Sequence, residues 1–269
     1  MNIVGRCIVA CLCVATLAGC GASYSTNLEE AQFALDTGDY ASAVTKATAA
    51  LVATPNDFEA TMTLSSALAG RAGVDLLTIS SSLADTTLTA QIFSTIHNSL
   101  VSVLVGGGQG LNDLRAAITT LTGFGGTVSN VHQYRFQLGL LQSVESFALP
   151  TMAAQPASGG TITATAISGT DATNTQNDFI DADNNLILGG LASTNALVTT
   201  MRKNYCALQL LSAGGGFTTA ELQDLTLCQL SSSAVQNTLT AVAGSFQSGS
   251  VATCASFDFT QCATTDTAL

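Results

Sequence analysis

Residues 38–57 read GDYASAVTKATAALVATPND and contain the clearest helical signal in the chain. Alanine, valine and leucine recur at the three- and four-residue spacing that places side chains on one face of a helix. Gly38-Asp39 precedes this pattern and Pro55-Asn56-Asp57 follows it, and both are combinations that interrupt helices. The stretch therefore predicts a helix from Tyr40 to about Ala53 between two short turns.

Capping patterns predict one helix on each side of this stretch. Thr26 with Glu29 has the spacing of a capping box, in which each side chain bonds a free backbone N–H of the first turn. This pattern predicts a helix that opens there and runs to about residue 37. Asn56 with Glu59 has the same spacing and predicts a third helix.

The same stretch resembles the second half of a tetratricopeptide repeat (TPR), a family of stacked antiparallel helix pairs. The matching residues hold the family's turn, packing and terminating positions: Gly38, Tyr40, Ala43, Ala50, Leu51 and Pro55. Small alanines let two helices approach closely, and glycine permits the tight reversal between them. The resemblance covers roughly residues 24–72, and Ala31 and Ala34 depart from the family's usual glycine and aromatic. At least three repeats are usually needed for a stable solenoid, so other helices must complete the core.

In that family, peptide partners lie along the first helix of each repeat. The resemblance therefore implies a candidate partner groove, which by position consists of Ser25, Leu28, Gln32, Leu35 and Asp36.

The rest of the chain also favours helices. Apolar periodicity and capping signals predict them near 88–105, 111–121, 131–152, 174–194, 196–212, 218–231 and 232–246. Pro150 is expected to end or kink the helix that contains it. Residues 153–173 are rich in glycine, serine and threonine and read as a loop with room for one short strand. The predicted fold is mostly α: a TPR-like N-terminal hairpin extended into an α-helical array or bundle.

The N-terminus has the features of a secretory signal. Arg6 precedes about eleven mostly apolar residues, which is too short to span a bilayer, and small residues follow. Leu17-Ala18-Gly19-Cys20 resembles the lipobox of bacterial lipoproteins. The resemblance implies cleavage before Cys20 and acylation of that cysteine, and several acyl chains on one residue suffice for stable anchoring. Gly21 in place of aspartate implies the outer membrane. A plain signal peptide is the alternative.

The other cysteines indicate an exported protein. Three of the eight cysteines precede Cys20, and four lie in the last quarter of the chain: Cys206, Cys228, Cys254 and Cys262. An even number in an oxidising compartment favours two disulfides, of three possible pairings. We favour Cys206–Cys228 and Cys254–Cys262 because each closes a short loop. A zinc site is the rival interpretation, but these spacings include no C-x-x-C pair.

Charge excludes one class of partner. Without Arg6 the mature chain has eighteen acids and six bases, a net charge of about −12. Only Lys46 and Lys203 are lysines, so binding to nucleic-acid phosphates is implausible. We expect such an acidic body to reach the membrane through its acyl anchor.

Motifs that would indicate catalysis are incomplete. The glycines from Gly106 lack the third glycine of a dinucleotide fingerprint and a Walker lysine. Asp181, Asp183 and Asn185 alternate as in a calcium loop, but later positions lack its glycine and glutamate, so we interpret them as a solvated helix face. His97 and His132 have no G-x-S-x-G elbow beside them. We predict no catalytic residue, metal or cofactor.

These observations predict four parts: a signal peptide (1–19), a lipid-anchored TPR-like helical region (20–152), a loop (153–173) and a C-terminal helical region with two disulfides (174–269). The two helical regions are expected to pack as one body. The first function hypothesis is a periplasm-facing, outer-membrane-anchored scaffold or adaptor that binds envelope proteins in assembly or transport. The alternatives are a carrier of an apolar ligand and an envelope hydrolase that would need a histidine beside a serine or acid.

Overall fold

The computed structural model describes residues 23–74, 109–153, 168–199 and 201–202. Within these ranges the chain is mostly helical and has no strand, which confirms a mostly α fold. None of the described helices is both long enough and apolar enough to cross a membrane. Several predictions lie outside the described residues: the lipobox, His97, the four late cysteines, the helices over 88–105, 218–231 and 232–246, and most of the helix over 196–212.

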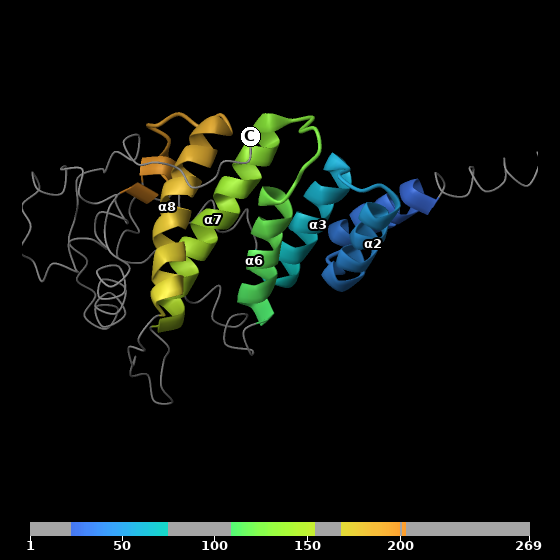
Figure 1. Cartoon of the computed structure of the whole chain (residues 1–269), viewed down its shortest axis with the longest axis horizontal. Coiled ribbons are helices and arrows are strands. Elements are labelled where there is room, and N and C mark those ends of the chain that lie inside the picture. The colour runs from blue at the N-terminus through green and yellow to red at the C-terminus, as the bar shows by residue number, and fades with distance from the viewer. Residues whose placement is uncertain (1–22, 75–108, 154–167, 200, 203–269) are drawn as a thin grey trace, which may run out of the picture.

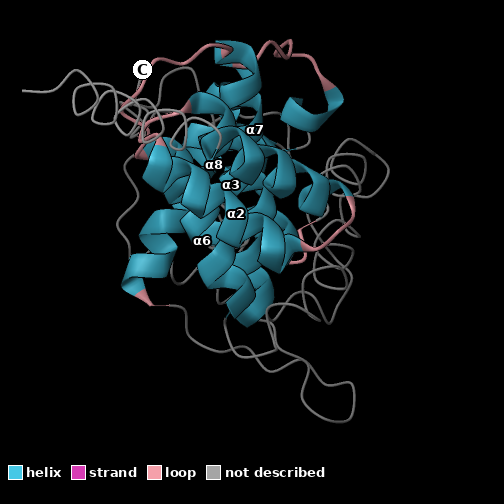
Figure 2. Cartoon of the chain, turned by 90° about the vertical axis from the view of Figure 1, so that its right-hand side faces the viewer, coloured by secondary structure: helices cyan, strands magenta, loops and turns pink. Residues whose placement is uncertain are grey.

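The described helices form one array in chain order (Figure 1). The helix over residues 23–36 and α2 (Tyr40–Ala53) lie at one end, and α3 (Phe58–Arg71), α6 (Gln109–Thr122), α7 (Val131–Ala153) and α8 (Gly169–Leu188) follow. α2 contacts α3, α3 contacts α6, α6 contacts α7, and the contact between α7 and α8 is the most extensive. Seen from the hairpin end, the helices overlap one behind another (Figure 2).

Acidic and hydroxyl side chains begin three of these helices. The Asp39 carboxylate accepts a hydrogen bond from the Ser42 N–H at 3.2 Å, and the Asp57 carboxylate accepts one from the Ala60 N–H at 2.9 Å. Such a bond satisfies one of the N–H groups that a first helical turn leaves free. The prediction of an Asn56 cap is therefore wrong by one residue. The predicted cap at Thr26 is wrong as well, because the helix already includes residue 23.

Glycines with positive φ end three helices in the same way. Gly38, Gly73 and Gly190 have φ of 77°, 76° and 101°. In each case the following N–H bonds a carbonyl five residues back, as Asp39 N–H does to Ala34 O at 2.8 Å. This is the Schellman motif, which requires a left-handed residue that glycine adopts without steric cost. The predicted break at Gly38 is thus explained, and α2 has its predicted bounds.

Two predicted boundaries in the second half of the chain are wrong. α8 spans Gly169–Leu188 rather than 174–194, so five residues assigned to the loop are helical. The helix starts before the predicted residue because Ser168 caps it, and it ends before the predicted residue because Gly190 stops it. α7 spans Val131–Ala153, close to the predicted 131–152, and continues three residues past Pro150.

The core runs along the array and is tightest between α7 and α8. Phe147 and Phe179 pack edge to face there with ring centroids 5.1 Å apart. Gly139 lets the two backbones approach, because a Cβ at this position would lie 2.9 Å from Leu186 N. Between α6 and α7, the buried Tyr134 hydroxyl donates to Leu121 O at 2.7 Å.

Candidate interaction surface and buried polar network

The five residues of the predicted partner groove lie on the helix over 23–36, and packing divides them. Ser25, Gln32 and Asp36 are exposed, whereas Leu28 and Leu35 are half-buried. Leu35 packs against a small cluster of buried alanines from this helix, α2 and α3. The surface that a partner can reach on this helix is therefore mainly polar at the predicted positions.

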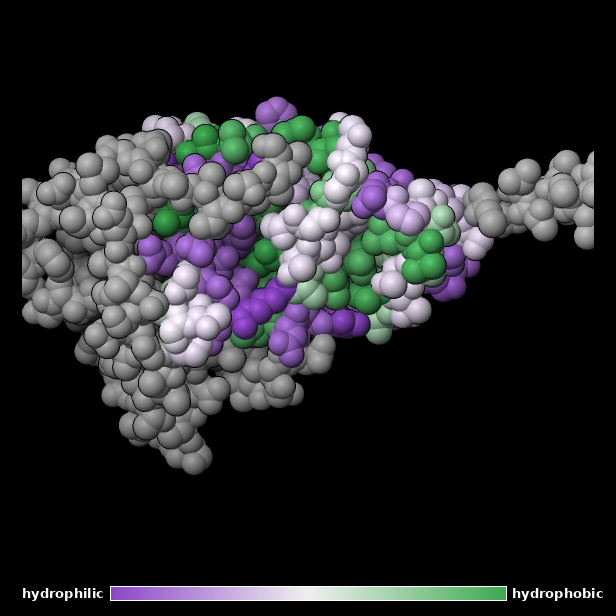
Figure 3. All heavy atoms as spheres, viewed as in Figure 1, coloured by the Kyte–Doolittle hydropathy of each residue, from purple (hydrophilic) through white to green (hydrophobic). Residues whose placement is uncertain are grey.

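Sequence reasoning missed the most accessible aromatic residue of this helix. Phe33 is 71% exposed, although Ala31 and Ala34 beside it are buried. Successive residues on a helix are rotated by about 100°, so the two buried alanines already place Phe33 on the outer face. An apolar surface is visible over the hairpin at the right-hand end of Figure 3.

The residues matched to the TPR packing positions have different environments. Ala43 and Ala50 are fully buried in the hairpin. The Tyr40 ring lies directly over Gly70 of α3, where a Cβ would overlap it. Leu51 is half-buried and Pro55 is exposed.

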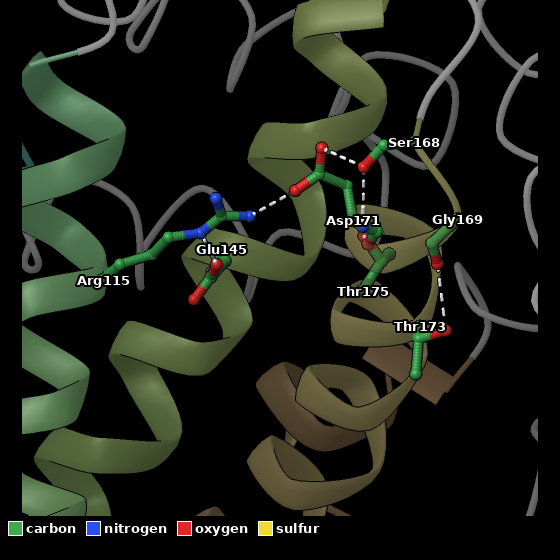
Figure 4. A network of polar contacts seen from close by, with 7 residues as sticks. All are labelled: Arg115, Glu145, Ser168, Gly169, Asp171, Thr173 and Thr175. Atoms are coloured by element: carbon green, nitrogen blue, oxygen red, sulfur yellow. Dashed lines mark hydrogen bonds and ion pairs between the residues drawn. The ribbon is translucent and has the colours of Figure 1, made fainter.

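A polar network links α6, α7 and α8 through one arginine (Figure 4). Arg115 of α6 donates from Nε to Glu145 Oε1 at 2.6 Å and from Nη2 to Asp171 Oδ1 at 2.7 Å. Ser168 donates to the other Asp171 oxygen at 2.7 Å and also caps α8. Arg115 therefore joins the buried middle of α7 to the exposed first turn of α8.

The two carboxylates that Arg115 contacts have opposite pKa shifts. Burial raises the pKa of Glu145 above its ordinary 4.5, because desolvation outweighs the pairing with Arg115. Desolvation acts in the same direction on Asp171, but there the hydrogen bonds from Arg115 and Ser168 prevail and lower its pKa below 3.8. Asp171 is the better solvated of the two, with 31% of its side chain exposed against 6% for Glu145.

The Asp181–Asn185 segment is buried, so its interpretation as a solvated helix face is wrong. Asp183 accepts two hydrogen bonds at 2.8 Å from Arg202, and both side chains are buried. Asn185 accepts from Arg135 Nη1 at 2.6 Å and donates to Gln142 Oε1 at 2.8 Å. These contacts join α8 to α7 and to residues 201–202, which is why polar side chains occupy the packed face of α8.

Asp178 adds a buried carboxyl group to the same face of α8. Its Oδ2 is buried and has no hydrogen-bond partner in the described part of the chain. Burial raises its pKa well above 3.8, and the charges of Glu145 and Asp181 raise it further, while Arg115 opposes them. Asp178 is therefore held as a neutral acid to higher pH than an ordinary aspartate.

Within the described part of the chain, the candidate catalytic and metal-binding side chains do not lie close together. His132 is exposed, and its Nδ1 lies 3.1 Å from the carbonyl oxygen of Leu188 at the end of α8, which accepts a hydrogen bond from the Nδ1–H tautomer. No group of three or more potential metal ligands occurs among the described residues.

Comparison with known proteins adds no family to this picture. Neither models of known protein families, nor curated proteins, nor solved structures yield a match to this chain. The polar network and the exposed hairpin surface are therefore interpreted from their own chemistry.

Proposed function

We propose that this chain is an outer-membrane lipoprotein, acylated at Cys20, whose TPR-like helical array is a scaffold for protein partners in cell-envelope assembly or transport. The partner surface is the outer face of the helix over 23–36. Its role is binding rather than catalysis, without a cofactor or nucleic acid.

The observation that carries this proposal is the exposed aromatic on the terminal helix of the array. Phe33 has 71% of its surface exposed and lies next to the exposed Gln32 on a helix whose other face packs against α2. Aromatic side chains among polar neighbours are the usual energetic centres of protein interfaces. The alanines beneath Phe33 hold this helix close to α2, so the aromatic is presented on a packed support.

Substitution of Phe33 tests the proposal in the full-length, membrane-anchored protein. Phe33→Glu should reduce recovery of crosslinked partners from native envelopes by about 30-fold, because an interface hot spot contributes about 2 kcal/mol. Thr173→Glu adds the same charge at an exposed position of α8 and should leave recovery unchanged. Circular dichroism should show both variants folded.

Three outcomes would contradict the proposal. Equal partner recovery for wild type and Phe33→Glu would remove this surface from the interaction. Mature protein without acyl mass on Cys20 would contradict the anchoring. Co-purification of an apolar ligand without any protein partner would favour a carrier instead.

A further inference from the structure

Three segments at the turns of the helices lie on one edge of the array and contain no acid or base, although Asp57 and His132 directly follow two of them. They are residues 52–56, from the last turn of α2 into its connection to α3, 123–131, from the end of α6 to the start of α7, and 188–195, from the end of α8 onward. We call these three segments the neutral edge.

Contacts between the segments show that they share this edge. The backbone of Asn56 lies against Gly126, where a Cβ would be 2.5 Å from Asn56 O. Phe58, at the start of α3, packs on Phe124 with ring centroids 6.0 Å apart. His132 Nδ1 lies 3.1 Å from Leu188 O and so joins the start of α7 to the end of α8. In Figure 1 these connections follow the upper side of the array.

The neutral edge also presents apolar side chains. Val52 is 78% exposed, Leu188 54% and Val131 48%, and these are three of the five large apolar residues that are exposed in the described chain. In the view of Figure 3, apolar surface is visible along this upper side. Exposed apolar groups without charge fit a partner that offers hydrocarbon and headgroups rather than a charged protein surface.

The other ends of the same helices differ in charge. Asp36 and Asp39 flank the turn that opens α2, Asp113 lies in the first turns of α6, and Asp171 lies in the first turn of α8. The described acids nearest the neutral edge are Asp57 and Glu59. The Asp57 carboxylate caps α3 and lies beside Tyr24, where burial and this carboxylate raise the pKa of the phenol.

The contact of Tyr24 with Asp57 also fixes where the chain enters the array. The helix over 23–36 begins beside the connection at 52–56, on the neutral edge. Only Gly21 and Ala22 separate Cys20 from residue 23. Three Cα–Cα steps span at most about 11 Å. An acylated Cys20 must therefore hold this corner of the array next to the membrane.

We propose that the neutral edge is a membrane-facing surface that lies against the phospholipid headgroups, with Val52, Val131 and Leu188 directed toward the lipid. This rests on the acylation of Cys20 proposed above. The array then stands with its helix axes across the headgroup plane and its acid-bearing ends away from it. The partner surface around Phe33 stays about 15 Å along its helix from the membrane corner.

Tryptophan fluorescence tests this in the full-length acylated protein, because the chain has no tryptophan of its own. Single substitutions Val52→Trp, Leu188→Trp and Phe33→Trp are reconstituted in vesicles of phosphatidylcholine, with or without brominated acyl chains. All three sites are more than half exposed, so each accepts the larger ring. Mass spectrometry of each sample establishes the acyl groups on Cys20.

We expect brominated lipid to quench tryptophan at positions 52 and 188 at least twofold more than at position 33. The quenching should change little with salt, because phosphatidylcholine has no net charge and the three segments of the edge contain no acid or base. Acylated protein with equal quenching at all three positions, or with quenching at position 52 alone, would overturn the membrane-facing edge and leave the proposed scaffold intact. Protein without acyl groups on Cys20 would overturn both.

Discussion

Gly139→Ala should destabilise the protein, although alanine is the better helix former. The added Cβ would lie 2.9 Å from Leu186 Cγ, 2.9 Å from Leu186 N and 3.1 Å from Ala182 O. Two of these three atoms belong to the backbone of α8, so a side-chain rotation cannot relieve the overlap. α7 and α8, the two described helices with the most extensive contact, must therefore move apart.

The magnitude follows from two opposing effects. Overpacking in a well-packed core costs about 1–3 kcal/mol. Replacing glycine by alanine inside a helix returns up to about 1 kcal/mol through helix propensity. Because two of the close atoms are backbone atoms of α8, the cost should lie in the upper part of that range, about 2–3 kcal/mol, and the net loss in the free energy of unfolding should be about 1–2 kcal/mol. Gly169→Ala is the matched control, because no atom lies within 4 Å of its added Cβ.

Urea unfolding followed by circular dichroism measures both variants. We expect a lower midpoint for Gly139→Ala and an unchanged or slightly higher midpoint for Gly169→Ala, with the same slope for all three proteins. If Gly139→Ala were as stable as the wild type, the close approach of α7 and α8 at this glycine would be refuted.

Three further predictions concern the polar contacts of α8. Asp183→Asn and Arg202→Met should each cost about 3–5 kcal/mol, because either leaves a buried charge without its partner, and the double variant should cost less than the sum in a double-mutant cycle. Because the pKa of Asp178 is raised, the folded state keeps this proton to higher pH than the unfolded chain does. The free energy of unfolding should therefore fall as pH rises from about 4 toward the raised pKa. Asp178→Asn should reduce this fall when unfolding is measured at a series of pH values. The pKa of Asp171 is lowered, so this carboxylate should stabilise the fold above pH 3.8, and the stabilisation should be lost as pH falls through the lowered pKa. Asp171→Asn should lower the free energy of unfolding at neutral pH by about 1 kcal/mol and should abolish this acid-dependent loss. An unchanged pH profile would contradict the contact with Arg115.

Local signals predicted the first half of the described fold well. The bounds of α2 follow from glycine, aspartate and proline at fixed positions, since these residue types act through their own backbone geometry. The cap of α3 was misplaced by one residue because Asn56 and Asp57 are both good caps. Asn56 instead adopts φ of 61° in the turn, which asparagine tolerates, and Asp57 takes the cap.

The polar face of α8 was not predictable from spacing alone. Asp181, Asp183 and Asn185 look like a solvated surface because charged groups are rarely buried without partners. The partners of Asp183 and Asn185, which are Arg202, Arg135 and Gln142, come from positions 19 to 50 residues away. Only the packing of α7 against α8 brings them together, so a single sequence gives no local sign of the pairing.

The described basic residues explain how a chain with so few charges keeps its helices in register. Each is engaged with a residue of another helical segment: Lys46 with Glu30, Arg71 with Asp113, Arg115 with Glu145 and Asp171, Arg135 with Asn185, and Arg202 with Asp183. They occur singly at successive contacts along the array, where an apolar face of alanine and leucine alone would allow neighbouring helices to slide. A buried ionic contact adds little net stability, but it penalises every register in which its partner is missing. Because each of these cations already has a contact within the array, little positive charge is left to attract an acidic partner. The partner of the array's acidic regions should therefore be basic or uncharged, and the membrane should meet the neutral edge.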